Sequence, residues 1–206
     1  MQDKTRLVDA TFLDDSSGLL LEAASPHTLE TIYFFEAQNI TKAALKYLSA
    51  TPDREMAPFD YGWFLQLHRE MFGDVWAWAG RVRHMELSIG VKAYLVPGEL
   101  KKLADDIAYW ESNRSFDVIE TAARIHHRAV QIHPFRNGNG RWSRMLANIY
   151  LKQHKLQPTQ WNENLLSREN PHRGGYIQAL KQADRGDYAA LIRLQGNLMD
   201  MNPPGL

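Results

Sequence analysis

The sequence contains no cysteine. This absence excludes disulfide bonds, cysteine-ligated zinc, iron–sulfur clusters and thiol nucleophiles. The chain also lacks an excess of charge of either sign, because its 24 Lys and Arg residues are matched by 24 Asp and Glu residues. A zero net charge gives no bulk attraction to nucleic acid or to an anionic membrane, so we expect neither as a partner.

Long hydrophobic runs are also missing. No apolar stretch approaches the roughly 18 residues of a membrane-spanning helix, and the N-terminal segment lacks the apolar core of a signal peptide. We therefore expect a soluble, cytoplasmic protein. Its 206 residues suit one domain with a short arm, and we place the arm at residues 1–24 and the domain at residues 25–206. The oligomeric state cannot be read from the sequence.

Helical periodicity dominates the hydrophobic pattern. A Ser-Pro pair at 25–26 is a helix start signal, and the following residues to about position 48 predict a helix with Tyr33 on its apolar stripe. Glu36 occupies one place in that stripe, which puts a carboxylate on an otherwise apolar face.

The rest of the chain predicts an all-α fold, a bundle of about seven or more helices with one small β-hairpin. The hairpin is expected near residues 84–96, where polar and apolar residues alternate. Arg81 and Arg83, just before it, are expected on the surface. Further helices are expected at about residues 60–72, 97–110, 117–132, 140–154, 175–183 and 187–199.

One stretch of the sequence combines a histidine, a turn of small residues and two arginines. It is residues 133–144, His-Pro-Phe-Arg-Asn-Gly-Asn-Gly-Arg-Trp-Ser-Arg. Gly138, Asn139 and Gly140 allow a tight turn with positive φ angles. The backbone N–H groups of such a turn, leading into a helix N-terminus, form a cradle for an anion. The turn is not a Walker A loop, because no Gly-Lys-Ser/Thr follows it.

Charged side chains on both sides of this turn indicate a phosphate ligand. Arg141 and Arg144 are three residues apart and share a helix face, and guanidinium groups bind phosphate oxygens in pairs. His133 precedes the turn and is the residue type that accepts a proton near neutral pH. His126 and His127 are adjacent and point to different faces, so they are a poor pair of metal ligands.

Residues 133–144 resemble the signature of the Fic family, His-Pro-Phe-x-Asp/Glu-Gly-Asn-Gly-Arg-x-x-Arg, at every defined place but one. Residues 68–83 resemble the segment that leads into the Fic flap hairpin, and residues 172–194 resemble its C-terminal helices. The stretches HHRAVQIHPFRNGNGR and GYIQALKQADRGDY are most similar to the Fic subgroup called mobile mystery protein B. The resemblance covers the chain from near residue 28 onward and implies the Fic fold.

The resemblance implies a nucleotidyltransferase that moves AMP from ATP to a Tyr, Ser or Thr hydroxyl of a target protein. His133 would be the general base, and Phe135 would pack inward to fix the loop. Arg141 would stabilise charge on the leaving phosphates, and Arg144 would reach the γ-phosphate. The turn residues Gly138, Asn139 and Gly140 would hold α- and β-phosphate oxygens. The hairpin near residues 84–96 would be the flap that aligns the target.

The one departure from the signature is Asn137, which stands where most Fic enzymes have an acidic ligand of Mg²⁺. An amide oxygen can still coordinate Mg²⁺ but brings no charge. Two alternatives therefore stay open. One is a phosphotransferase or UMP transferase of the Fic type, and the other is a nucleotide-binding module with weakened catalysis.

Many Fic proteins carry an inhibitory helix with the motif Ser/Thr-x-x-x-Glu-Gly/Asn. Residues around Glu36 do not match it, because Thr31 precedes by five positions and Ala37 follows. The inward position of Glu36 still makes an ion pair with Arg144 a testable expectation. Residues 25–50 are thus either an inhibitory helix or a packing helix.

Overall fold

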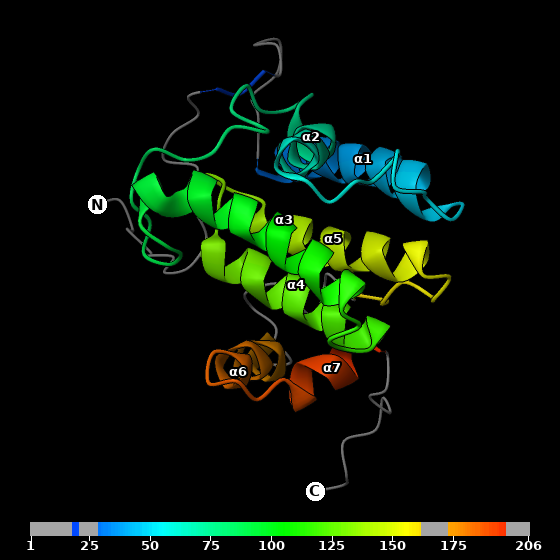
Figure 1. The fold of residues 1–206 in the computed structure, drawn as a ribbon. Helices are drawn as coiled ribbons and strands as arrows, with labels where there is room; N and C mark the ends of the chain where they lie inside the picture. Colours follow the sequence, from blue (N-terminus) through cyan, green and yellow to red (C-terminus); the bar gives the residue numbers. More distant parts are fainter. Residues whose placement is uncertain (1–17, 21–28, 162–172, 197–206) are drawn as a thin grey trace, which may run out of the picture.

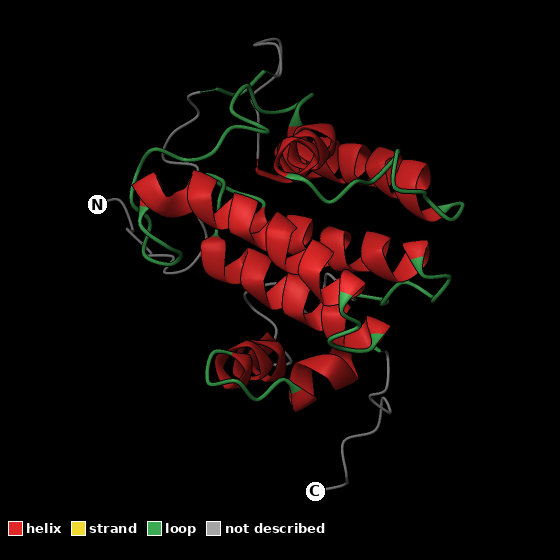
Figure 2. Cartoon of the chain, viewed as in Figure 1, coloured by secondary structure: helices red, strands yellow, loops and turns green. Residues whose placement is uncertain are grey.

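Helix signals in the sequence coincide with helices in the computed structural model, which describes residues 18–20, 29–161 and 173–196. Within these residues the fold is all-helical, as predicted (Figure 2). The elements are α1 (Leu29–Leu48), α2 (Tyr61–Phe72), the 3₁₀ turn η1 (Ala93–Leu95), α3 (Val96–Ser112), α4 (Val118–Ile132), α5 (Asn139–Gln153), α6 (Arg173–Ala183) and α7 (Ala189–Gln195).

Side-chain caps form at the starts of two of the predicted helices. The side chain of Asp60 accepts a hydrogen bond from the N–H of Trp63 at 2.7 Å, and that of Asp117 accepts one from Glu120 at 2.8 Å. Such caps satisfy backbone donors that the first helical turn leaves without partners, and each contributes about 1 kcal/mol. The start signal predicted at 25–26 lies outside the described residues.

The helices are arranged in tiers (Figure 1). The pair α4 and α5 forms the centre of the molecule, with α1 and α2 on one side and α6 and α7 on the other. The main core is aromatic near the start of α5, where Trp142, Phe64 and Phe135 are fully buried. The indole of Trp142 donates to the Phe64 carbonyl at 3.1 Å, so this bulky side chain is also satisfied as a donor.

The buried face of α1 differs from the predicted stripe by one residue. Ile32, Ala43 and Tyr47 are buried, whereas Tyr33 is 56% exposed. The shift arises because Glu36 and a second polar residue, Asn39, both lie on the inner face, where they are buried. Periodicity based on apolar residues alone therefore placed the stripe slightly off its true position.

The predicted β-hairpin near residues 84–96 is wrong. Residues 84–92 form an irregular loop, and Ala93–Leu95 is the 3₁₀ turn η1 (Figure 2). The carbonyls of Met85 and Val91, which strand pairing would use, accept hydrogen bonds from the Arg83 guanidinium instead. Gly90, at φ 100°, adds a turn that L-residues rarely adopt.

Within the described residues, the β pairing is a single antiparallel bridge between Leu19 and Trp76. Around it the N–H of Leu20 donates to the Val75 carbonyl at 2.9 Å. Leu19 also packs against the core. This short piece of the predicted arm therefore lies on the domain, and the boundary between an arm at 1–24 and a domain at 25–206 stays a prediction.

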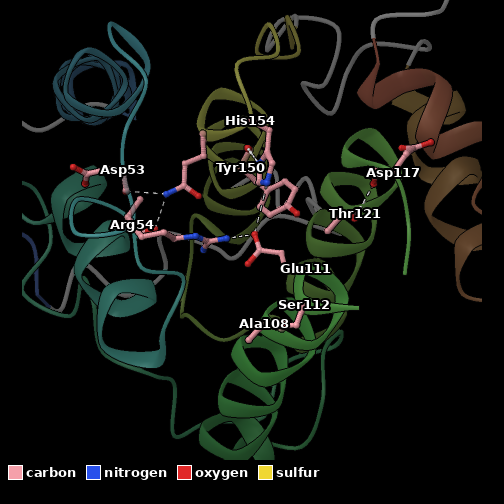
Figure 3. Close-up of polar contacts among 11 residues, drawn as sticks. Asp53, Arg54, Ala108, Glu111, Ser112, Asp117, Thr121, Tyr150 and His154 are labelled. Atoms are coloured by element: carbon pink, nitrogen blue, oxygen red, sulfur yellow. Dashed lines mark hydrogen bonds and ion pairs between the residues drawn. The ribbon is translucent and has the colours of Figure 1, made fainter. Parts of the chain in front are cut away.

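Polar contacts hold the end of the bundle where α5 finishes (Figure 3). Arg54, in the connection between α1 and α2, forms an ion pair with Glu111 near the end of α3. The side chain of Gln153 donates to the backbone carbonyl of Asp53 at 2.9 Å. These contacts lie at the end of α5 opposite to the motif segment, so they stabilise the scaffold without entering the candidate site.

The two adjacent histidines of α4 attach the C-terminal helices. Nε2 of His126 lies 2.9 Å from the hydroxyl of Tyr176 on α6, and Nε2 of His127 lies 2.9 Å from a carboxylate oxygen of Asp184. Nδ1 of His127 lies 3.0 Å from the hydroxyl of Tyr188, so these imidazoles join α4 to α6 and to the start of α7. Among the described residues, no helix is both long enough and apolar enough to cross a bilayer.

Candidate active site

The motif segment is the connection between α4 and α5. His133 is the C-cap of α4 in the left-handed conformation (φ 50°, ψ 60°), and Gly138 is the N-cap of α5, also left-handed (φ 77°). The first hydrogen bond within α5 runs from Trp142 N–H to the Gly138 carbonyl at 2.9 Å. The N–H groups of the three residues 139–141 precede it, which is the arrangement that favours an anion.

Asn139 braces this loop from inside. Its Oδ1 accepts from the N–H of Phe135 and its Nδ2 donates to the carbonyl of the same residue, both at 2.8 Å. Phe135 is fully buried, as expected for an anchor. The side chain of Asn139 is used by the loop itself, which leaves its backbone N–H for a ligand, and the expected contact with phosphate stays a prediction.

His68, on α2, is a second brace that we did not single out from the sequence. Its Nδ1 accepts from the N–H of Gly80 at 3.0 Å, so its Nε2 carries the proton and donates to the Asn137 carbonyl at 3.0 Å. The ring stacks on Phe135 with centroids 3.6 Å apart. Burial lowers the pKa of His68 to about 3; the Asn137 carbonyl opposes this shift and the Arg141 charge adds to it. His68 is therefore neutral and holds one tautomer.

The side chain of Asn137 is turned back on the loop. Its Oδ1 accepts a hydrogen bond from the N–H of Gly138 at 2.6 Å. There is no room for a side chain at Gly138, because a Cβ there would lie 2.6 Å from the ring of Phe72. Within the described part of the chain, no group of three His, Asp or Glu side chains forms a metal site.

Glu36 pairs with the first arginine of the motif. Its Oε2 accepts from Nη1 of Arg141 at 2.6 Å, and its Oε1 accepts from the indole N–H of Trp76 at 2.7 Å. The Glu36 side chain is 2% exposed and that of Arg141 is 27% exposed. The expected pair with Arg144 is wrong, because the geometry of α1 brings the carboxylate to Arg141 instead.

Arg141 and Arg144 share a face, as their spacing predicts. Both line a groove of about 690 Å³ between α1 and α5, with Met145 and Asn148 further along α5. Arg144 is 7% exposed, and its Nη1 lies near Gly140, 3.3 Å from where a Cβ would stand. The guanidinium of Arg141 lies over the ring of Phe72 at 4.7 Å. Two cations thus flank the first turn of α5.

The imidazole of His133 is partly buried beside the loop at 84–92. Burial lowers the pKa of His133 to about 4; the Val130 carbonyl acts in the opposite direction and the charge of Arg83 lowers it further. Its Nδ1 is buried without a hydrogen-bond partner. The ring is therefore neutral at pH 7, and a neutral imidazole has one nitrogen able to accept a proton.

Arg83 lies against His133, which corrects the expectation of a surface position. Its side chain is 4% exposed, and its Nε donates to the His133 carbonyl at 2.7 Å. The sequence signal was weak because an arginine beside a loop is usually solvated. Arg81, two residues earlier, is exposed as expected.

Residues 58–151, which span the motif segment and the helices on both sides of it, match the sequence model described as the Fic/DOC family. Over these residues the chain is a Fic/DOC family domain. The matched region begins three residues before α2 and ends within α5, so it contains the histidine, the cradle, both arginines and the loop at 84–92. The subgroup suggested by the sequence is not confirmed.

Curated relatives are similar over most of this Fic/DOC chain. It is 29% identical over 155 residues to "Protein adenylyltransferase Fic" of Aedes aegypti and 30% identical over 156 residues to "Protein adenylyltransferase fic-1" of Caenorhabditis elegans. Each match covers 73% of this chain, but only 30% and 29% of the relative. The chain thus spans about a third of the length of the curated relatives it matches.

Solved structures show the same fold. The Fic-1 fragment of C. elegans superposes with a TM-score of 0.66 at 24% identity, covering 85% of this chain and 51% of that one. BepC of Bartonella tribocorum, solved with bound AMPPNP, superposes with a TM-score of 0.60 at 16% identity, covering 89% and 96%. At these identities the likeness concerns the fold.

Proposed function

We propose that this Fic/DOC protein is an adenylyltransferase that transfers AMP from ATP to a Tyr, Ser or Thr hydroxyl of a protein. One arrangement carries the proposal. A neutral imidazole, His133, stands at the start of a loop whose far end leaves the first N–H groups of α5 without helical partners, and Arg141 and Arg144 lie in the turns that follow. The names of the curated relatives, protein adenylyltransferases, support the same reaction.

In the proposed reaction, Nε2 of His133 accepts the proton of the target hydroxyl. The oxygen forms a bond to the α-phosphorus of ATP as the bond between that phosphorus and the bridging oxygen to the β-phosphate breaks. Pyrophosphate leaves with the electron pair of the broken bond. The Val130 carbonyl, which acts on this ring, would keep a proton on Nδ1, so that the ring would present Nε2 to the substrate.

The phosphates would lie on the N-terminal turn of α5. The N–H groups of Gly140 and Arg141 precede the first helical hydrogen bond and can donate to phosphate oxygens. The guanidinium groups of Arg141 and Arg144 would counter the charge that develops on the leaving pyrophosphate. Asn139 would take part through its N–H, since its side chain braces Phe135.

Mg²⁺ is proposed as part of the Mg–ATP substrate. The chain would offer it a single neutral ligand, Oδ1 of Asn137, one lone pair of which already accepts from the N–H of Gly138. Phosphate oxygens would supply the other bonds. The same hydrogen bond favours the second candidate, a nucleotide-binding module that turns over slowly, because it keeps one lone pair of that ligand and a cradle N–H occupied.

Glu36 is proposed to restrain the enzyme. While its carboxylate holds Nη1 of Arg141, that guanidinium cannot turn fully toward a phosphate. Helix α1 would then be an inhibitory helix that acts on the first arginine of the motif. The alternative is a packing helix in which Glu36 mainly satisfies the indole of Trp76.

The target segment is proposed to bind along the loop at 84–92. Met85 and Ile89 are 49% and 55% exposed there, which offers apolar contacts next to His133. Because this loop is not a hairpin, its backbone could pair with an extended peptide at positions other than Met85 and Val91, whose carbonyls accept from Arg83. The cytoplasm remains the proposed location, and fractionation of cells that express the tagged chain tests it.

Intact mass of the protein and of lysate proteins after incubation with Mg–ATP tests the reaction, with His133→Ala as the control. A gain of one AMP that the control lacks supports adenylyl transfer. A gain of one phosphate, or of UMP when UTP is supplied, supports the alternative transferases. Binding of ATP without any adduct supports the nucleotide-binding module.

A further inference from the structure

Arg83 is a buried guanidinium whose hydrogen-bonding groups all go to backbone carbonyls. Nε donates to His133, Nη1 to Met85 at 3.0 Å, and Nη2 to Val91. Among the described residues, no carboxylate lies within ion-pair distance of it; burial lowers the pKa of Arg83 and the charge of Glu86 raises it. Burying a charge without a direct ion pair is costly unless its donors are satisfied, and here each of the three guanidinium nitrogens donates to a carbonyl.

Backbone hydrogen bonds also join this loop to the end of α4. The N–H of Arg83 donates to the Pro134 carbonyl at 2.9 Å, and the N–H of Val91 donates to the Ile132 carbonyl at 3.4 Å. Both ends of the loop at 83–91 are therefore attached to the residues on either side of His133. Side chain and backbone of Arg83 together form a clamp between this loop and the end of α4.

Gly90 packs closely against His133. A Cβ on Gly90 would lie 2.6 Å from the Cβ of His133 and 2.9 Å from Nη2 of Arg83. The loop therefore lies directly against the histidine, with no space for one methyl group. Any movement of the loop moves the surface on which the imidazole rests.

His133 needs such support from outside. It adopts a left-handed conformation that is unfavourable for a residue with a Cβ. A general base is commonly oriented by a group bonded to its second nitrogen. For the His133 ring the group in that role is a backbone carbonyl of its own helix, that of Val130, so its orientation also depends on its backbone and its packing.

We propose that Arg83 is a positioning residue for His133: it holds the His133 carbonyl and the 84–92 loop as one unit, so that the base and the target-docking surface move together. This inference rests on the proposed function for the role of the base. The geometry of the clamp does not depend on that role, so it can be tested separately.

The test uses the full chain with Arg83→Lys and Arg83→Met, and with Arg81→Met as the matched control on an exposed arginine. Lysine keeps the charge but cannot bridge three carbonyls. We expect Arg83→Lys to lower kcat for AMP transfer about 100-fold, the scale of a misplaced catalytic group, with KM for ATP changed less than about twofold. Arg81→Met should behave as the wild type.

Imidazole NMR signals of His133, assigned through His133→Ala, give a readout that needs no activity. The groups that act on this ring are the Val130 carbonyl on its own helix and the Arg83 guanidinium across from it. We expect the ring signals to shift in both Arg83 variants. The pKa of His133 should rise in Arg83→Met, which removes the cation, and stay low in Arg83→Lys.

Unchanged ring signals in folded Arg83→Lys overturn the proposal, as does a kcat loss no larger than the fraction of unfolded protein. If the wild type transfers no AMP, the proposed function fails, but the ring signals still decide whether Arg83 positions His133. If the Arg83 variants do not fold, exchange of the Arg83 Nε–H proton with solvent is measured in the wild type. Slow exchange supports the hydrogen bond from this Nε to the His133 carbonyl, and exchange as fast as at the exposed Arg81 overturns the clamp.

Discussion

Oε2 of Glu36 lies 2.6 Å from Nη1 of Arg141, a residue 105 positions later in the chain. The contact joins α1 to the first turn of α5. It occupies the Arg141 guanidinium, which the proposed reaction needs to bind phosphate. A single ion pair thus connects the N-terminal helix to the chemistry of the motif.

Replacing Glu36 tests this restraint. We expect Glu36→Gly and Glu36→Gln to raise incorporation of labelled AMP into the protein itself roughly tenfold to hundredfold. This is the range for releasing one hydrogen bond to a charged group. Glycine also costs about 1 kcal/mol of helix stability, and glutamine avoids that cost, so a rise in both variants identifies the charge as the cause.

Trp76→Phe is the matched control for this experiment. It removes the indole donor to Glu36 but leaves the pair with Arg141, so its transfer rate should stay within about twofold of the wild type if the ion pair is the restraint. Equal incorporation in wild type and both Glu36 variants would show instead that α1 is a packing helix.

His133→Ala should retain ATP binding by calorimetry and lose transfer by about 10²- to 10⁴-fold, the usual contribution of a general base. The pH profile of kcat/KM gives a second check. Because the pKa of His133 is about 4, the ring is deprotonated throughout the neutral range. The profile should be level between about pH 6 and 8 and fall below about pH 5. An inflection near pH 6.5 would contradict this assignment.

Asn137→Asp restores the acidic residue of the family signature. We expect it to tighten Mg²⁺ binding in the presence of ATP and to raise the transfer rate at low Mg²⁺, because a carboxylate adds charge to a site that has one neutral ligand. Titration of the rate with Mg²⁺ measures the effect. Asn139→Asp is the contrasting variant: it loses the donor to the Phe135 carbonyl and should destabilise the loop without a gain in metal affinity.

Acid should weaken the fold through buried histidines. Burial lowers the pKa of His126 to about 3 and that of His133 to about 4 in the folded chain. Unfolded histidines titrate near 6.5, so below that pH the unfolded state takes up protons that the folded state refuses. The free energy of unfolding should therefore fall by about 2 kcal/mol for each of these histidines between pH 7 and pH 5.

Urea unfolding at the two pH values measures this loss. The variant His133→Ala should reduce the pH dependence of the free energy of unfolding. The variant His84→Ala, at an exposed histidine, should leave that pH dependence unchanged. A loss of the same size in all three proteins would assign the acid sensitivity to other groups.

The helices and the motif were largely readable from local sequence. Capping at Asp60 and Asp117 depends on residues three positions apart, and the turn at 138–140 depends on glycine, so both are decided locally. The same holds for the shared face of Arg141 and Arg144. The prediction of a hairpin at residues 84–96 was wrong because alternation indicates a strand only when a partner strand exists. Here the Met85 and Val91 carbonyls accept hydrogen bonds from Arg83 instead.

By itself, the sequence determined the helical class, the order of the helices and the residues of the motif, because short-range periodicity and capping encode them. The tertiary structure alone decided which distant groups meet. It set Glu36 against Arg141 rather than Arg144, put His68 beneath the loop, and buried Arg83 behind His133. Those contacts depend on how helices far apart in the chain pack together, and no local pattern specifies that packing.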